Sequence, residues 1–302
     1  MNTVSKTYKV AGHFFRLTLP DSERLSAALS RQYDPFIVTE DIPGEDLLFS
    51  LEYTDTLEET PRECIYDVPT EDGETVVKLY REQDGWFFET SPDHRLPVVS
   101  TVRSTKDFRS AKFALASKRL TDAVFGINNA AMLLFAFASA SLDTLEMHAS
   151  VVENDGRGYL FLGKSGTGKS THSSLWLKYI EGTTLMNDDN PVIRVGEDGV
   201  VRVYGSPWSG KTPCYKNVEA PIGAIVQIRR CKENKITRQN VLEAFSSLFS
   251  SISGLKDDEE SMADGLNATM DKVISGVPFY VLDCRPDEEA ALVCHKGVTS
   301  RD

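Results

Sequence analysis

The segment from Gly163 to Ser170 constrains this chain more than any other part of its sequence. It reads Gly-Lys-Ser-Gly-Thr-Gly-Lys-Ser and fits the pattern G-x-x-x-x-G-K-[ST] at every fixed position. An apolar stretch at 158–162 precedes it and predicts a strand, and a helix-compatible stretch at 170–180 follows it. In this context the pattern predicts a phosphate-binding loop between a strand and a helix, and therefore an α/β domain.

Each residue type in the loop has a chemical reason. Glycines let the backbone turn sharply and bring bare N–H groups toward phosphate oxygens. Lys169 is expected to reach the β- and γ-phosphates of ATP, and the Ser170 hydroxyl to bind Mg²⁺. The other residues predicted to line the nucleotide site are Gly163, Lys164, Ser165, Gly166, Thr167, Gly168 and Thr171. The alternative is a glycine-rich turn that binds no nucleotide.

A pair of carboxylates follows the loop. Asn187-Asp188-Asp189 comes after the apolar Leu185-Met186, so it is expected at the end of a strand, where ligands bind in open α/β sheets. One carboxylate can hold Mg²⁺, together with Ser170, and the other can accept a proton from an attacking hydroxyl. The alternative is an ordinary Asx turn leading into Pro191.

Two histidines and one loop are less specific signals. His148 is expected on the strand 145–153, where a lone histidine is usually a core residue. His172 falls in the first turn of the loop's helix, where a solvent-facing side chain is one interpretation. The loop 205–213 is rich in small residues and fits either a mobile flap over the phosphates, with Lys211 as a cation, or a plain strand-to-strand connection.

The rest of the chain divides into two parts that differ in their pattern of apolar and turn-forming residues. Residues 1–118 show short apolar runs between turn signals, including a hairpin across Asp84-Gly85, and predict a mainly-β accessory domain. Residues 119–302 alternate helical and strand patterns and predict the α/β nucleotide-binding domain. The apolar run at 130–140 is too short to span a bilayer, which needs about 20 residues, and predicts a buried helix.

Charge and cysteine content limit the partners. The 33 basic and 45 acidic residues give a net charge of −12, which disfavours nucleic acid and anionic membranes as ligands. The five cysteines include no closely spaced pair, so we expect free thiols in a reducing compartment. The amino-terminal stretch lacks the apolar run of a signal peptide, and together these features favour the cytoplasm.

The arrangement of these motifs resembles the catalytic domain of HPr kinase/phosphorylase. The resemblance lies in His148, the run GYLFLGKSGTGKSTHS and the run LMNDDNPVI. The loop and the Asp pair are also similar to the kinase motifs of phosphoenolpyruvate carboxykinase. The resemblance implies that the fold is a P-loop kinase core of this type with a smaller mainly-β N-terminal domain. It also implies that Asp188 is the base, that Asp189 assists with metal or hydrogen bonding and that His148 orients the pair.

The resemblance also implies a reaction. We expect an ATP- and Mg²⁺-dependent kinase that phosphorylates a hydroxyl, on a small molecule such as serine or on a protein serine, and that forms a homo-oligomer. GSPWSGKT stands where the family carries Glu-x-Arg-Gly, so the expectation is limited to phosphoryl transfer. The alternatives are an ATP-binding sensor or scaffold with a kinase-like fold, a carboxykinase-like enzyme, and a P-loop ATPase coupled to motion.

Overall fold

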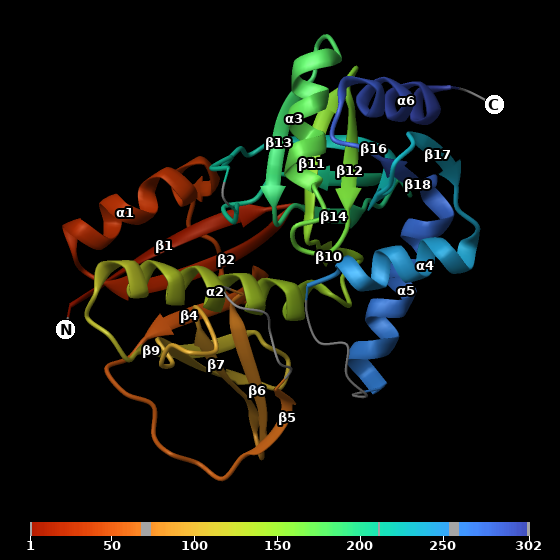
Figure 1. Ribbon diagram of the computed structural model, residues 1–302. Helices are drawn as coiled ribbons and strands as arrows, with labels where there is room; N and C mark the ends of the chain where they lie inside the picture. The colour runs from red at the N-terminus through yellow and green to blue at the C-terminus, as the bar shows by residue number, and fades with distance from the viewer. Residues whose placement is uncertain (1, 68–73, 211, 254–259, 301–302) are drawn as a thin grey trace. The chain divides into compact units, whose positions relative to one another are not determined.

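The computed structural model describes residues 2–67, 74–210, 212–253 and 260–300, with 260–264 described by their backbone alone. The chain divides into two compact units, Met1–Ala138 and Ser139–Asp302. Both are mixed α/β structures, each built on a large sheet (Figure 1). The helix at 120–139, expected from the sequence in the nucleotide-binding part, belongs to the first unit almost entirely.

As far as the structure describes it, the first unit is one broad sheet with two helices. Among its described residues the strand order is β3-β1-β2-β4-β9-β8-β7-β6-β5. The strands are β1 (Thr3–Val10), β2 (His13–Pro20), β3 (Ile37–Val38), β4 (Leu47–Tyr53), β5 (Glu63–Asp67), β6 (Val76–Glu82), β7 (Gly85–Ser91), β8 (Ser100–Thr105) and β9 (Ser110–Leu115). The helices are α1 (Glu23–Tyr33) and α2 (Leu120–Ser139), with short 3-10 turns η1 (Asp34–Phe36) and η2 (Gly44–Asp46).

The predicted hairpin exists, but its turn lies one residue earlier than expected. Glu82 pairs with Gly85, so Gln83 and Asp84 form the two-residue turn and Gly85 is the first residue of β7. The glycine is needed for close packing, because a Cβ there would lie 1.9 Å from the carbonyl oxygen of Ser104. A glycine in a strand often marks such a close approach of another backbone.

Helix α1 was not anticipated from the sequence, although its signals are present. Ser22 caps it by accepting a hydrogen bond from the Leu25 amide, and its buried residues Leu25, Leu29 and Tyr33 recur every four positions. In the described part of the chain, α2 is the one helix with the length and apolar composition of a membrane span. Half of its apolar window is buried in the structure.

The second unit is a sheet with helices on both faces. The described strands follow the order β10-β14-β15-β16-β12-β11-β13, and β18 extends from β16 with β17 beside it. They are β10 (Thr144–Glu146), β11 (Ala149–Asn154), β12 (Arg157–Leu162), β13 (Thr184–Asp189), β14 (Val192–Val195), β15 (Val201–Tyr204), β16 (Glu219–Arg230), β17 (Lys235–Arg238) and β18 (Phe279–Cys284). The helices are α3 (Lys169–Tyr179), α4 (Val241–Ser251), α5 (Glu260–Gly276) and α6 (Glu288–Thr299).

Alternating strand residues divide this unit's core into two layers. Val151, Leu160 and Leu162 pack with residues of α4 and α5, and Val152 and Phe161 pack with residues of α3 and α6. Neighbouring residues of a strand point to opposite faces, so these apolar strands are buried on both sides. The result is a three-layer helix–sheet–helix arrangement, in which α3 and α6 lie side by side (Figure 1).

Candidate active site

The strand directions bring the predicted site residues to one edge of the second sheet. Ala149, the first residue of β11, pairs with both Leu162 at the end of β12 and Asp189 at the end of β13. Since β11 runs antiparallel to both neighbours, β12 and β13 end at the same edge. The loop that follows Leu162, the Asp pair and His148 therefore meet there, at the carboxyl ends where open α/β sheets bind ligands.

The phosphate loop follows β12 with a backbone that requires glycine. Gly163, Gly166 and Gly168 have φ values of 150°, 74° and 111°. A Cβ at Gly163 would also lie 2.5 Å from the hydroxyl oxygen of Thr167. That hydroxyl donates to the carbonyl of Lys164 at 2.7 Å, closing the turn. The side chains of Lys164, Ser165 and Thr171 are exposed around it.

Helix α3 presents unsatisfied amides at this point. Its N-cap is Gly168, and no side chain caps it. The first amides of a helix have no intrahelical acceptor and carry the positive end of the helix dipole, which suits a phosphate. The helix is anchored from behind by Trp176, which is fully buried. The elements present therefore fit the phosphates of a nucleotide.

His172 helps to anchor the helix and is not solvent-facing, so that interpretation was wrong. It is 2% exposed, lies edge-on to Phe161 with ring centroids 4.7 Å apart, and accepts a hydrogen bond from the Trp176 indole at 3.1 Å. Burial lowers the pKa of His172 from 6.5 to about 4, so its imidazole is neutral at pH 7.

Lys169 is folded back beneath the loop. Its Nζ donates to the Gly163 carbonyl at 2.8 Å and lies 2.9 Å from Nε2 of His148. Burial lowers the pKa of Lys169, and the charges of Asp189 and Asp188 offset part of that shift. The lysine is thus a cation held at the centre of the site by carbonyl and imidazole acceptors.

His148 connects this lysine to the Asp pair. Its Nδ1 lies 3.1 Å from Oδ1 of Asp189. An ammonium can only donate and a carboxylate only accept, so a neutral imidazole with its proton on Nδ1 satisfies both neighbours. Contrary to the expectation of one strand over 145–153, His148 lies in the break between β10 and β11. The break follows from its partners, because its amide donates to the Ser251 carbonyl at 2.6 Å.

Asn187, just before the Asp pair, shapes the turn that holds it. Its buried amide group donates to Ser206 Oγ and to the Trp208 carbonyl and accepts from the Asn190 amide. Asp188 is buried, whereas the Asp189 side chain is 36% exposed. Asp189 has a φ of 141°, a conformation that side-chain-bearing residues rarely adopt and that clusters at functional sites.

The loop after β15 is part of the site's framework. The Gly210 amide and the Ser209 hydroxyl both donate to the Asp188 carbonyl, at 2.7 and 3.0 Å. Ser206 and Trp208 are buried. This portion of the loop is therefore fixed to the turn that holds Asp188 and Asp189, called the Asp turn below. It is not a flap that moves free of the sheet. Lys211, predicted as a cation of this loop, lies outside the described residues.

Two further polar residues near the site were missed from the sequence. Asn187 was seen only as a neighbour of the Asp pair, and its role as the turn's anchor depends on the distant Ser206. Glu146 is 1% exposed, and burial, with the charge of Asp189, raises its pKa well above the usual range. The Ser253 side chain offsets part of that shift, yet neither carboxyl oxygen has a partner at hydrogen-bond geometry among the described residues. The signal for Glu146 in the sequence was the position of a glutamate within an apolar run.

The donor set fits a metal that arrives with phosphates. The Ser170 side chain is exposed at the start of α3, and Asp188 and Asp189 end β13 at the same edge. Within the described ranges no three His, Cys, Asp or Glu residues cluster as a self-sufficient metal site. Mg²⁺ usually binds through one or two carboxylates together with substrate phosphates, so these residues suit it.

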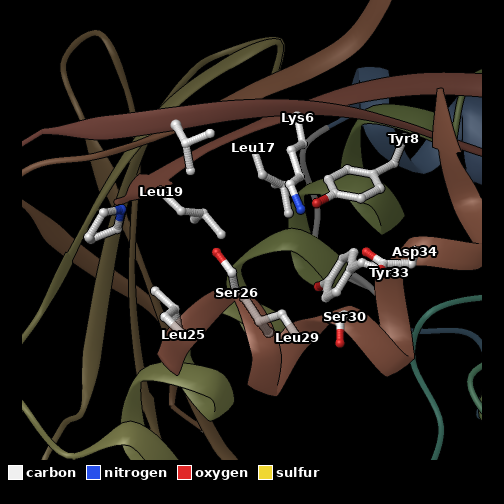
Figure 2. Close-up of a pocket in the computed structure, with 12 residues that line it drawn as sticks. Lys6, Tyr8, Leu17, Leu19, Leu25, Ser26, Leu29, Ser30, Tyr33 and Asp34 are labelled. Carbon is white, nitrogen blue, oxygen red and sulfur yellow. The ribbon is translucent and has the colours of Figure 1, made fainter. Parts of the chain in front are cut away.

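A cavity in the first unit is separate from this set of residues. It lies between α1 and strands β1 and β2 and is lined mainly by apolar and aromatic side chains, among them Tyr8, Leu17, Leu29 and Tyr33 (Figure 2). None of the predicted site residues that the structure describes lines it.

Similarity to known proteins is found among solved structures. No protein-family model matches the chain, and no curated protein matches it. Among solved structures, the Hpr(Ser) kinase/phosphatase from Coxiella burnetii is similar at a TM-score of 0.30 and 11% identity, over 50% of this chain and 91% of that one. A similarity at this TM-score supports no functional argument, so the case depends on the site itself.

Proposed function

We propose that this protein is an ATP- and Mg²⁺-dependent kinase that transfers the γ-phosphate to a hydroxyl, on a small molecule or on a protein serine. One observation carries the proposal. Lys169 of the phosphate loop, His148 and Asp189 form a continuous series with contacts of 2.9 and 3.1 Å. A phosphate-binding cation is thereby linked through an imidazole to a carboxylate, which is the pairing that phosphoryl transfer to a hydroxyl needs.

The loop supplies binding and charge stabilisation. The free amides at the start of α3 and the glycine-shaped backbone hold the phosphates, and Lys169 turns from the Gly163 carbonyl to the β- and γ-phosphate oxygens. Phosphoryl transfer needs positioning and electrostatic stabilisation more than covalent chemistry from the protein. Ser170 and Asp188 would hold Mg²⁺, which would supply positive charge against the charge that develops on the phosphate oxygens.

The two carboxylates divide the remaining work. The family resemblance implies that Asp188 is the base that accepts the proton of the acceptor hydroxyl, but the geometry favours Asp189. Asp189 is the more exposed of the two, and Nδ1–H of His148 orients one of its oxygens. Its other oxygen accepts from Asn190 at 3.1 Å. We assign Asp188, buried beside it, to the metal. An acceptor hydroxyl would lose its proton to Asp189 as its oxygen attacks the γ-phosphorus.

The test is phosphorus NMR of the protein with Mg-ATP. Separate samples contain no acceptor, free L-serine, a mixture of other hydroxyl compounds, or HPr. We expect a new phosphomonoester signal with at least one acceptor, abolished in Asp189→Asn and retained in Asp198→Asn. Asp198 is a suitable control because it lies on an exposed turn paired with Arg202. ATP that binds but stays unchanged in every sample would overturn the kinase proposal and favour the sensor.

A further inference from the structure

Arg230 contacts carbonyl oxygens of the phosphate loop. It is the last residue of β16, the strand that runs parallel to β12 and ends at the same edge of the sheet. Its Nη2 donates to the Gly166 carbonyl, and its Nε donates to the Thr167 carbonyl at 3.4 Å. One side chain from a neighbouring strand therefore holds two consecutive peptide groups of the loop.

The direction of these bonds determines where the loop amides point. In a trans peptide the carbonyl and the following N–H point in opposite directions. With the Thr167 carbonyl held by Arg230, the Gly168 amide points away from the arginine. The preceding peptide is fixed at both ends, because the Thr167 amide donates to the Lys164 carbonyl at 3.1 Å. Arg230 thus fixes the peptide whose amide is the last before helix α3.

No carboxylate among the described residues neutralises the charge of Arg230. Its neighbour Arg229 makes two bonds to Asp283, at 2.9 and 2.8 Å. In the part of the chain that the structure describes, no ion pair involves Arg230. On a protein with a net charge of −12, this leaves a full positive charge directly behind an anion site. A cation so placed strengthens binding of a polyphosphate.

We propose that Arg230 is a positioning residue of the phosphate site, which orients the loop amides through their carbonyls and adds a second cation to Lys169. The inference rests on the proposed nucleotide binding and deepens it. Its consequence is that Arg230 controls affinity for polyphosphates, with a larger effect on the more highly charged ligand. Arg229, next in sequence, has no such role because Asp283 neutralises it and it contacts no loop carbonyl.

The test measures binding by calorimetry, at low and high salt, with Mg-ATP, Mg-ADP and tripolyphosphate as ligands. We expect Arg230→Gln to weaken Mg-ATP binding roughly tenfold, the order expected from losing a charged hydrogen-bond donor. The loss should be smaller for Mg-ADP and should shrink at high salt. Arg230→Lys should restore part of the affinity, because lysine keeps the charge but lacks the planar fork. The matched control Arg229→Gln should stay within about twofold of the parent protein, the range of a surface charge.

A second measurement keeps the inference testable without nucleotide. Hydrogen exchange of the ligand-free protein reports the amides of the loop, and Arg230→Gln should accelerate their exchange while Arg229→Gln should not. If the parent protein binds nucleotide and the two variants behave alike in both assays, the role of Arg230 is refuted and the kinase proposal stands. If the parent protein binds no nucleotide, the kinase proposal fails, and loop exchange still decides whether Arg230 orders the loop.

Discussion

The two halves of the site are built in different ways. The phosphate loop is specified by eight consecutive residues, and its shape follows from three glycines with positive φ. The Asp turn is specified by contacts from distant segments, namely Ser206, Trp208 and Gly210 after β15 and His148 before β11. A motif of the first kind takes its basic shape from local backbone chemistry, to which the distant Arg230 adds bonds to two carbonyls. A motif of the second kind depends on how the whole sheet is assembled.

This difference predicts that the two halves fail in different ways, and Asp189→Asn should have the largest effect on rate. Loss of a general base typically lowers the rate by about 10²–10⁴-fold. Asparagine has nearly the same shape as aspartate, so the turn should persist and the Kd for Mg-ATP should change little. Single-turnover kinetics beside calorimetry separates the two quantities. A variant that loses binding and rate together would show that Asp189 shapes the nucleotide site instead.

The pH dependence of stability should report on the half of the site that contains the phosphate loop, through His172 of helix α3. Its pKa falls from 6.5 to about 4 on folding, so below pH 6.5 the unfolded chain takes up a proton that the folded protein does not. Stability should therefore decline as pH falls from 6.5 toward 4, by about 1.4 kcal/mol per pH unit and about 3 kcal/mol in total. This residue adds no pH dependence above pH 6.5.

Urea unfolding at several pH values measures the loss of stability, and a variant at His172 separates its contribution from that of the carboxyl groups. His172→Gln keeps an acceptor for the Trp176 indole but cannot titrate, so its stability should decline less steeply between pH 6.5 and 5. Equal slopes in the parent protein and His172→Gln would contradict the buried neutral state.

The difference between local and distant contacts also explains which parts of the structure could be predicted from the sequence. The loop, the strand before it and the helix after it were predicted closely, because glycine chemistry and apolar runs are local signals. The turn of the first hairpin was misplaced by one residue, since Gly85 serves the approach of Ser104 rather than the turn itself. The burial of His172 and the break at His148 depend on Phe161 and Ser251, which no local pattern could reveal.

Gly163→Ala should distort the phosphate loop and have little effect on the Asp turn. At φ 150° an added Cβ would be strained and would lie 2.5 Å from Thr167 Oγ1. We expect a cost of about 1–3 kcal/mol, which corresponds to roughly 5- to 150-fold weaker nucleotide binding if the strain appears in the loop. Gly156→Ala is the matched control, because Gly156 also has positive φ but an added Cβ meets nothing within 4 Å. Equal nucleotide affinity in both variants would refute this account of the loop.

Ser206→Ala should have the smallest effect and should act on the Asp half alone. The Ser206 hydroxyl donates to the Asn190 carbonyl at 2.5 Å and accepts from Asn187 Nδ2 at 3.2 Å. Asn187 retains its bond to the Trp208 carbonyl at 3.1 Å, so the loss should be about 1–2 kcal/mol of stability. Because the turn that presents Asp189 loosens while the loop is untouched, we expect kcat to fall severalfold with an unchanged Kd for Mg-ATP. Ser250→Ala, which removes one exposed hydroxyl from α4, supplies the control. A weaker Kd in Ser206→Ala would mean that the two halves are coupled through the sheet edge rather than built independently.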